Sequence, residues 1–185
     1  MKLREPLDFY SVTDHGFFMG MLNAWSDTST DISQKDFAKP FHDLNRVENL
    51  TAESAGPRSA LFSQILGGTV TQTYSDLSPN VLKAWLTKNT QTALKSFDYE
   101  IHKSAWEDVA RAANEHNDPG HFTTFIGYEF TTSTNVEGGN LHRNVIFNSS
   151  KAPIRPWTRI DSINPEDLWT WQDKLRDKGV DTVSI

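Results

Sequence analysis

The hydrophobic residues of this chain fall into short runs separated by polar loops and helical patterns. The run over 7–12 is rich in aromatic and β-branched residues, which predicts a buried strand. Similar runs over 122–130 and 141–147 predict two further strands, and 180–185 predicts a last one. Because a polar loop with two adjacent glycines joins 122–130 to 141–147, we expect these two strands to pair as a hairpin.

Helical patterns occupy much of the remaining chain. The apolar segment 17–25 predicts a short helix, whereas 26–66 shows no regular period. Ser78 followed by Pro79 predicts the start of another helix, whose apolar stripe extends to residue 86. A long stretch of helical and irregular chain is therefore expected after the first strand.

Two more helices have clear boundary signals. Ser104 and Glu107 form a capping-box pattern, so a helix is predicted to begin at Ser104 and to end near 117–120. Asn164 is a cap residue for a helix over 165–178, which a glycine ends. The alternation of strands and helices favours an α/β fold with a largely parallel sheet or a barrel.

The composition excludes several classes of function. The chain has 185 residues with 18 Lys and Arg against 24 Asp and Glu, and this net charge of −6 argues against partners that are nucleic acids or anionic membranes. No apolar run approaches the ~18 residues of a membrane span, and the first residues lack the apolar region of a signal peptide. A cytoplasmic and a periplasmic location both stay open. Because cysteine is absent, any metal must be held by His, Asp or Glu.

Polar residues with metal-binding or acid–base chemistry lie near the ends of the predicted strands. Asp14 and His15 follow the first strand directly, where they can bind a metal or transfer protons; the alternative is a turn cap beside a surface histidine. Glu129 lies near the end of 122–130 among aromatic residues, where a buried carboxylate needs a partner or a metal. Its alternative is an outward-facing strand position.

His142 completes this set of candidates. It lies at the start of 141–147, so a hairpin would bring it within about 5 Å of Glu129 across the two strands. The alternative is a half-exposed histidine with no ligand. The other histidines lie in loops or at helix ends and are weaker candidates.

Three segments of the chain, in order, resemble motifs of one superfamily. The segment 7–16, an apolar strand ending in Thr-Asp-His-Gly, is similar to a motif of the polymerase and histidinol phosphatase (PHP) superfamily of metal-dependent hydrolases. The segment 125–130, Phe-Ile-Gly-Tyr-Glu-Phe, resembles its Gly-x-Glu motif, and 140–147 resembles the histidine-bearing strand that follows. Over nearly the whole chain, the resemblance is closer to a large bacterial family of unknown function related to that superfamily.

The resemblance implies a fold, a site and an activity. The fold would be part of a distorted, TIM-like (β/α)7 barrel with a long helical and irregular insertion. His15, Glu129 and His142 would be ligands of divalent metal ions (zinc, manganese or iron), with Asp14 and His15 as catalytic residues. The activity would be hydrolysis of an ester or phosphoester bond of a small-molecule substrate by metal-activated water.

The chain also departs from the superfamily pattern. It contains no His-x-His motif, and it ends before the later histidine and the distal Asp-x-His that the superfamily has. We therefore expect residues 1–185 to be one incomplete PHP-like domain, an internal fragment in which 16–103 is an insertion. An incomplete barrel would expose strand edges, which predicts self-association. The alternative function is a non-catalytic protein that binds a small molecule or glycan on the same scaffold.

Overall fold

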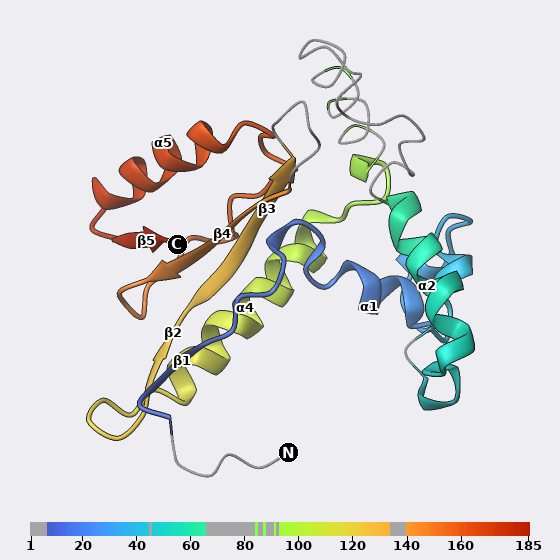
Figure 1. The fold of residues 1–185 in the computed structure, drawn as a ribbon, viewed down its shortest axis with the longest axis horizontal. Coiled ribbons are helices and arrows are strands. Elements are labelled where there is room, and N and C mark those ends of the chain that lie inside the picture. Colours follow the sequence, from blue (N-terminus) through green and yellow to red (C-terminus); the bar gives the residue numbers. More distant parts are fainter. Residues whose placement is uncertain are drawn as a thin grey trace. The chain divides into compact units, whose positions relative to one another are not determined.

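The computed structural model describes most of the chain and divides it into two compact units (Figure 1). Unit 1 contains Met1–Phe17, Lys103–Thr132 and Leu141–Ile185, and unit 2 contains Phe18–His102 and Ser133–Asn140. The helix predicted from Ser78 lies almost entirely outside the described residues. The described ranges are 7–44, 46–65, 93–133 and 140–185, together with residues 84, 87 and 91.

Unit 1 has two small sheets. Strand β1 (Phe9–Ser11) pairs in parallel with β2 (Thr123–Phe125). The second sheet has the order β3-β4-β5, and β4 and β5 are antiparallel. Its strands are β3 (Gly127–Ser133), β4 (Asn140–Phe147) and β5 (Thr182–Ser184). The predicted pairing of the two strands that flank the polar loop is confirmed as the β3–β4 pair.

The prediction of a partial (β/α)7 barrel is wrong for the described chain. The five described strands form a two-stranded and a three-stranded sheet with no closed barrel, although the unit is still an α/β structure. A barrel needs successive parallel strands in one continuous sheet. Here the β3–β4 hairpin and the antiparallel strand β5 take the place of further parallel strands. The alternation of strands and helices in the sequence therefore does not produce a closed barrel.

The predicted strand over 122–130 is divided between the two sheets. The break falls at Ile126, whose carbonyl accepts a hydrogen bond from the Phe147 amide at 2.9 Å. At the next residue, a Cβ on Gly127 would lie only 2.5 Å from Ser11 Oγ and 3.3 Å from the Val145 carbonyl oxygen. A side chain at residue 127 would therefore clash with the Ser11 hydroxyl, so glycine fits at the point where the chain passes from one sheet to the other.

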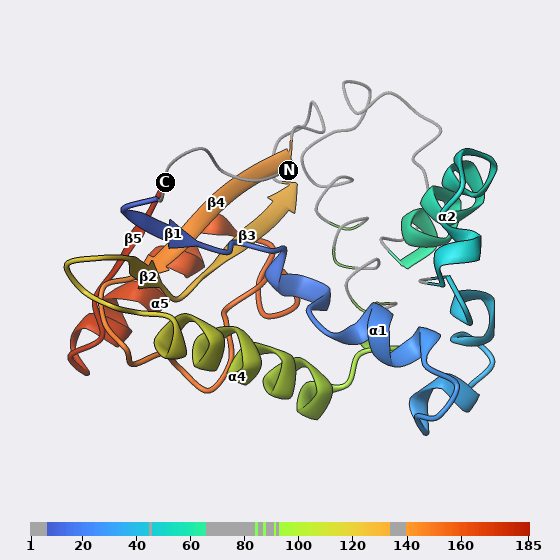
Figure 2. The same ribbon diagram turned by 90° about the horizontal axis from the view of Figure 1, so that it is seen from below.

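Helix α4 (Tyr99–Glu115) packs on one face of the second sheet and runs alongside the strands (Figure 2). The centroid of its Trp106 ring lies 5.7 Å from that of the Tyr128 ring on β3 and 5.8 Å from that of the Phe147 ring on β4. Trp106 is 1% exposed, and its Nε1 donates to the Pro153 carbonyl at 2.8 Å. Because side chains alternate along a strand, Glu129 lies on the opposite face from Tyr128.

The cap predicted for this helix lies six residues too late in the chain. Asp98, not Ser104, provides the cap: its Oδ1 accepts from the amides of Glu100 at 2.9 Å and Ile101 at 3.1 Å. Ser104 lies inside the helix and is exposed. Aspartate is as strong a cap as serine, so the capping-box spacing alone did not distinguish the two positions.

Helix α5 (Pro165–Arg176) agrees closely with its prediction. The Asn164 side chain accepts a hydrogen bond from the Glu166 amide at 3.3 Å, and Pro165 occupies the first turn. Gln172 is buried, and its Nε2 donates to Thr182 Oγ1 of β5 at 2.8 Å. Local cap signals and an apolar stripe together determine this element.

Unit 2 contains short helical elements and one longer helix. The helix predicted over 17–25 is divided into η1 and α1, because Gly20 takes a left-handed backbone with φ of 79°. Helix α2 was not predicted from the sequence. Pro57 lies inside it, and most of its described side chains are exposed, so the segment lacks the apolar stripe that predicts a helix. The elements within unit 2 are α1 (Met21–Ser26), η2 (Ile32–Gln34), η3 (Lys39–Phe41), η4 (Val47–Asn49) and α2 (Ala52–Ile65), whereas η1 (Gly16–Phe18) begins at the end of the first segment of unit 1.

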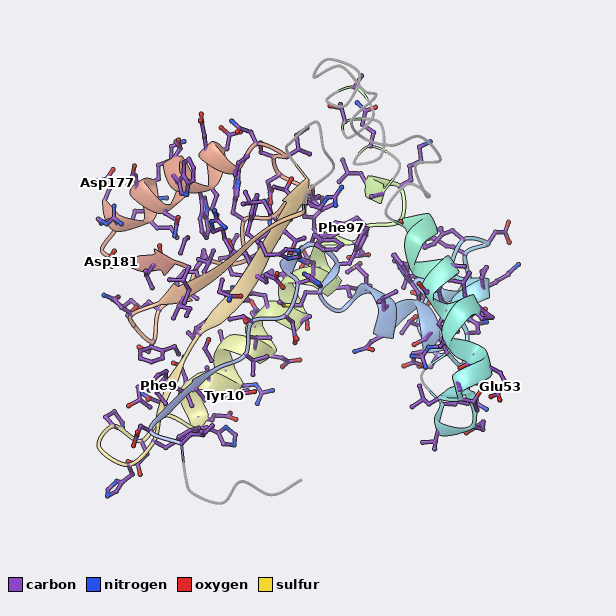
Figure 3. All side chains as sticks on the ribbon, viewed as in Figure 1. Phe9, Tyr10, Glu53, Phe97, Asp177 and Asp181 are labelled. Carbon is purple, nitrogen blue, oxygen red and sulfur yellow. The ribbon has the colours of Figure 1, made fainter. Side chains whose placement is uncertain are left out.

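The first strand is exposed, which corrects the prediction that it is buried. Phe9 is 67% exposed and Tyr10 is 50% exposed (Figure 3), and Leu7 and Val12 are also exposed. Within the described chain, β1 pairs only with β2, and the Phe9 ring has an edge contact with Phe125. The pattern of apolar residues therefore predicted the strand correctly but did not predict its exposure.

We expect the chain to self-associate through β1. Among the residues that the structure describes, one edge of β1 has no partner strand, and such an edge with exposed aromatic residues favours pairing with another copy. Light scattering after size exclusion should show a mass that rises with concentration. Phe9→Lys should shift the population toward monomer, whereas Val47→Lys, at a position 82% exposed in unit 2, should not. A monomer at all concentrations in the unmodified chain would contradict this expectation.

Candidate metal centre

His15 is brought beside Glu129 by the backbone. After β1 ends, residues His15 and Glu129 form an isolated parallel bridge, and the Glu129 amide donates to the Asp14 carbonyl at 2.8 Å. The β1–β2 pairs and this bridge have the same offset of 114 residues, since Phe9 pairs with Thr123 and His15 with Glu129. The chain therefore keeps one parallel register from β1 through to the site.

His142 reaches the same place from the neighbouring strand. Glu129 lies on β3 and His142 on β4, and His142 Nδ1 contacts Glu129 Oε1. His15 Nδ1 lies 3.0 Å from Glu129 Oε2. One ligand atom from each of His15, Glu129 and His142 lies within 4.8 Å of the others, so these three predicted residues come together.

The site is open on the histidine side and more enclosed around the carboxylate. The His15 and His142 side chains are 48% and 46% exposed, whereas the Glu129 side chain is 19% exposed. The centroids of the two imidazole rings lie 5.8 Å apart, and the planes of the rings are inclined at 40° to each other. The Phe17 ring, itself buried, lies 5.5 Å from the His15 ring and forms one wall of the site. Solvent and a small ligand therefore have access to both histidines.

The charges of the site depend on the protonation of the histidines. With neutral imidazoles, two nitrogen lone pairs can face one carboxylate, and such a set of acceptors attracts a cation. With protonated imidazoles, the same contacts are ion pairs with Glu129. Nitrogen and carboxylate ligands suit zinc, manganese and iron, and three protein ligands with an open side are typical of catalytic metal sites.

Asp14 is not part of this cluster. The group of possible ligands formed by the described residues contains His15, Glu129 and His142 but not the Asp14 carboxylate. Asp14 contributes its backbone carbonyl to the bridge with Glu129, and the residue is exposed. Its predicted catalytic role stays a prediction.

Thr131 belongs to the site and was missed in the sequence. Its Oγ1 lies 2.8 Å from His15 Nδ1 and 3.4 Å from His142 Nδ1. The available signal was the period of two along a strand, which puts residue 131 on the same face as Glu129. Threonine is common in strands, so the residue type alone does not indicate a functional role.

A separate cavity of about 500 Å³ lies between α4 and the β1–β2 pair. None of the three cluster residues lines it. Its walls are largely apolar, with His116 and Asp108 among the polar residues at its surface. The residues that form most of the apolar wall are Tyr10, Val12, Val109, Ala113, Phe122 and Phe125.

Among the described residues, no helix combines the length and apolar character that crossing a lipid bilayer requires.

Comparison with known proteins identifies the family of this chain. No curated protein and no solved structure matches the chain. One family model, described as "Protein of unknown function (DUF3604)", matches residues 1–185. Because the match covers the full sequence, the chain belongs to this family of unknown function, DUF3604.

Proposed function

We propose that this chain carries a metal site of a hydrolase that acts on ester or phosphoester bonds of small molecules. The observation that supports the proposal most strongly is the convergence of His15, Glu129 and His142 within 4.8 Å. These residues come from three separate segments of the chain, so local sequence does not explain their meeting. The resemblance of the same three segments to PHP motifs supports the choice of reaction.

Each residue of the proposed site has a distinct task. Glu129 supplies negative charge from the enclosed side of the site, while His15 and His142 supply nitrogen ligands from the open side. A bound divalent metal would lower the pKa of a coordinated water to about 7 and stabilise negative charge on the attacked group. Asp14, exposed and adjacent to His15, is the proposed proton-transfer residue.

Metal analysis together with a hydrolysis assay tests the proposal. The purified chain should retain zinc, manganese or iron at close to one ion or more per chain. Hydrolysis of p-nitrophenyl phosphate or p-nitrophenyl acetate should stop on chelation and return when one of these metals is added back. Asp14→Asn should lower the turnover without lowering the metal content.

A matched control comes from another histidine–carboxylate pair on the surface. His121 Nδ1 lies 3.2 Å from Asp118 Oδ2, and both side chains are more than 70% exposed. His121→Ala should therefore leave metal content and hydrolysis unchanged. A chain that binds none of the three metals, or hydrolysis that persists through chelation, would contradict the proposed function.

The apolar cavity between α4 and the β1–β2 pair favours a second candidate, a non-catalytic small-molecule binding protein. Its volume of about 500 Å³ is within the range of pockets that hold small ligands. An apolar fluorescent probe such as anilinonaphthalene sulfonate would then bind with the same affinity before and after chelation. Such binding without any metal-dependent hydrolysis would favour this candidate over the first.

A further inference from the structure

The hydroxyl of Thr131 lies between the two histidines of the candidate metal centre. Its Oγ1 is 2.8 Å from His15 Nδ1 and 3.4 Å from His142 Nδ1. The residue is 8% exposed, whereas both imidazoles are about half exposed. A nearly buried hydroxyl thus contacts two accessible rings from the enclosed side of the site.

Both imidazoles present Nδ1, and not Nε2, to the rest of the cluster. His15 Nδ1 lies 3.0 Å from Glu129 Oε2, and His142 Nδ1 contacts Glu129 Oε1. An exposed histidine samples several ring orientations, and fixing one of them costs conformational entropy. A hydrogen-bonding group that contacts both Nδ1 atoms can offset this cost before any metal binds.

The neighbouring Thr132 shows what a purely structural threonine looks like on the same strand. It is fully buried, and its Oγ1 donates to the Ile163 carbonyl at 2.9 Å. The alternation of side chains along β3 puts it on the face opposite Thr131. The two adjacent threonines therefore differ in the groups that their hydroxyls contact, and they form a matched pair for comparison.

We propose that Thr131 is a positioning residue of this site, whose hydroxyl holds the His15 and His142 rings with Nδ1 toward Glu129. The metal part of this inference rests on the proposed function, whereas the orientation of the rings does not. Groups that orient a metal-binding histidine usually bond the ring nitrogen that does not bind the metal, and their removal lowers metal affinity by about 10–100-fold. The Thr131 hydroxyl instead contacts the same Nδ1 atoms that face Glu129, so its contacts also compete with a metal for these nitrogens. We therefore expect the loss of this one hydroxyl to change the ring orientations in the metal-free protein, and to lower Zn²⁺ affinity by less than about 10-fold.

The test compares three variants in two measurements. Thr131→Val removes the hydroxyl at nearly constant volume, Thr131→Ser keeps the hydroxyl, and Thr132→Val is the control on the other face. Zn²⁺ affinity is measured by competition with a chromophoric chelator. Independently, the ring-nitrogen shifts of His15 and His142 are measured by NMR in the metal-free protein labelled with ¹⁵N-histidine, and circular dichroism checks that each variant is folded.

Thr131→Val should change the ring-nitrogen shifts of both histidines in the metal-free protein and lower Zn²⁺ affinity by less than about 10-fold. Thr131→Ser should retain the original values in both measurements, even if the valine variant is poorly folded. Thr132→Val should lose thermal stability but keep the affinity and the shifts. The positioning role is overturned if Thr131→Val changes neither the Zn²⁺ affinity nor the ring-nitrogen shifts. It is also overturned if Thr131→Ser changes both as much as Thr131→Val does.

The two proposals can fail separately. If the unmodified chain binds no Zn²⁺, the proposed metal site fails, but the ring-nitrogen shifts still report whether Thr131 orients the histidines. If the unmodified chain binds Zn²⁺ and Thr131→Val binds it equally well with unchanged shifts, only the role of Thr131 fails.

Discussion

Glu129→Gln should remove metal binding from this chain. The substitution keeps the size of the side chain but eliminates its negative charge, and Glu129 is the only carboxylate in the described three-residue cluster. A cation between two neutral imidazoles would lose its opposite charge at close range, where Coulomb attraction is strongest. Removing a group that only hydrogen-bonds to a metal ligand lowers metal affinity by up to about 100-fold. We expect Glu129→Gln to lower it by more than that, because Glu129 is itself a proposed ligand.

The measurement is Zn²⁺ or Mn²⁺ affinity by titration calorimetry, with metal content per chain after dialysis as a second readout. Asp118→Asn is the control, because Asp118 also pairs with a histidine but lies outside the cluster. His15→Ala should lower metal content in the same way as Glu129→Gln. Retention of close to one metal ion per chain by the glutamine variant would show that Glu129 is not a ligand.

Trp106→Ala should strongly destabilise unit 1. The ring is 1% exposed, packs against Tyr128 and Phe147, and donates from Nε1 to the Pro153 carbonyl. Replacing a buried tryptophan by alanine costs about 3–5 kcal/mol, because it leaves a cavity and removes apolar contacts. That is a large share of the about 5–15 kcal/mol that stabilises a typical domain.

Urea unfolding followed by circular dichroism measures this loss. Trp169→Ala is the matched control, since Trp169 lies on α5 and is 48% exposed, and it should change the stability far less. Because Tyr128 adjoins Glu129 on β3, we also expect Trp106→Ala to weaken metal binding through partial unfolding. A change as small as that of Trp169→Ala would contradict the central role of Trp106 in the core.

Elements with strong local signals were predicted well from the sequence. Helix α5 follows its cap at Asn164, its proline start and its apolar stripe, all of which act within a few residues. Helix α4 was predicted to exist, but its start at Tyr99 depends on Asp98 rather than on the capping-box pattern at Ser104. Helix α2 lacks an apolar stripe, so periodicity did not reveal it.

Burial and sheet topology were predicted less well, because they depend on segments distant in the sequence. The apolar residues of β1 indicated a buried strand, yet within the described chain β1 pairs with one neighbour and Phe9 is 67% exposed. The alternation of strands and helices indicated a largely parallel sheet or a barrel. Instead, the described strands form two separate sheets, because the chain passes from one sheet to the other at Gly127 and β5 is antiparallel. No local pattern encodes these pairings.

By itself, the sequence determined which residue types are available for chemistry and which short elements carry them. Without cysteine, metal ligands had to be His, Asp or Glu, and strand patterns singled out Asp14, His15, Glu129 and His142. Only the tertiary structure decided which of these meet: His15, Glu129 and His142 converge, while the Asp14 carboxylate lies outside the group. The reason is that a strand pattern specifies only the face on which a side chain lies. The parallel β1–β2 register, which the His15–Glu129 bridge continues, and the pairing of β3 with β4 arise from contacts more than ten residues apart.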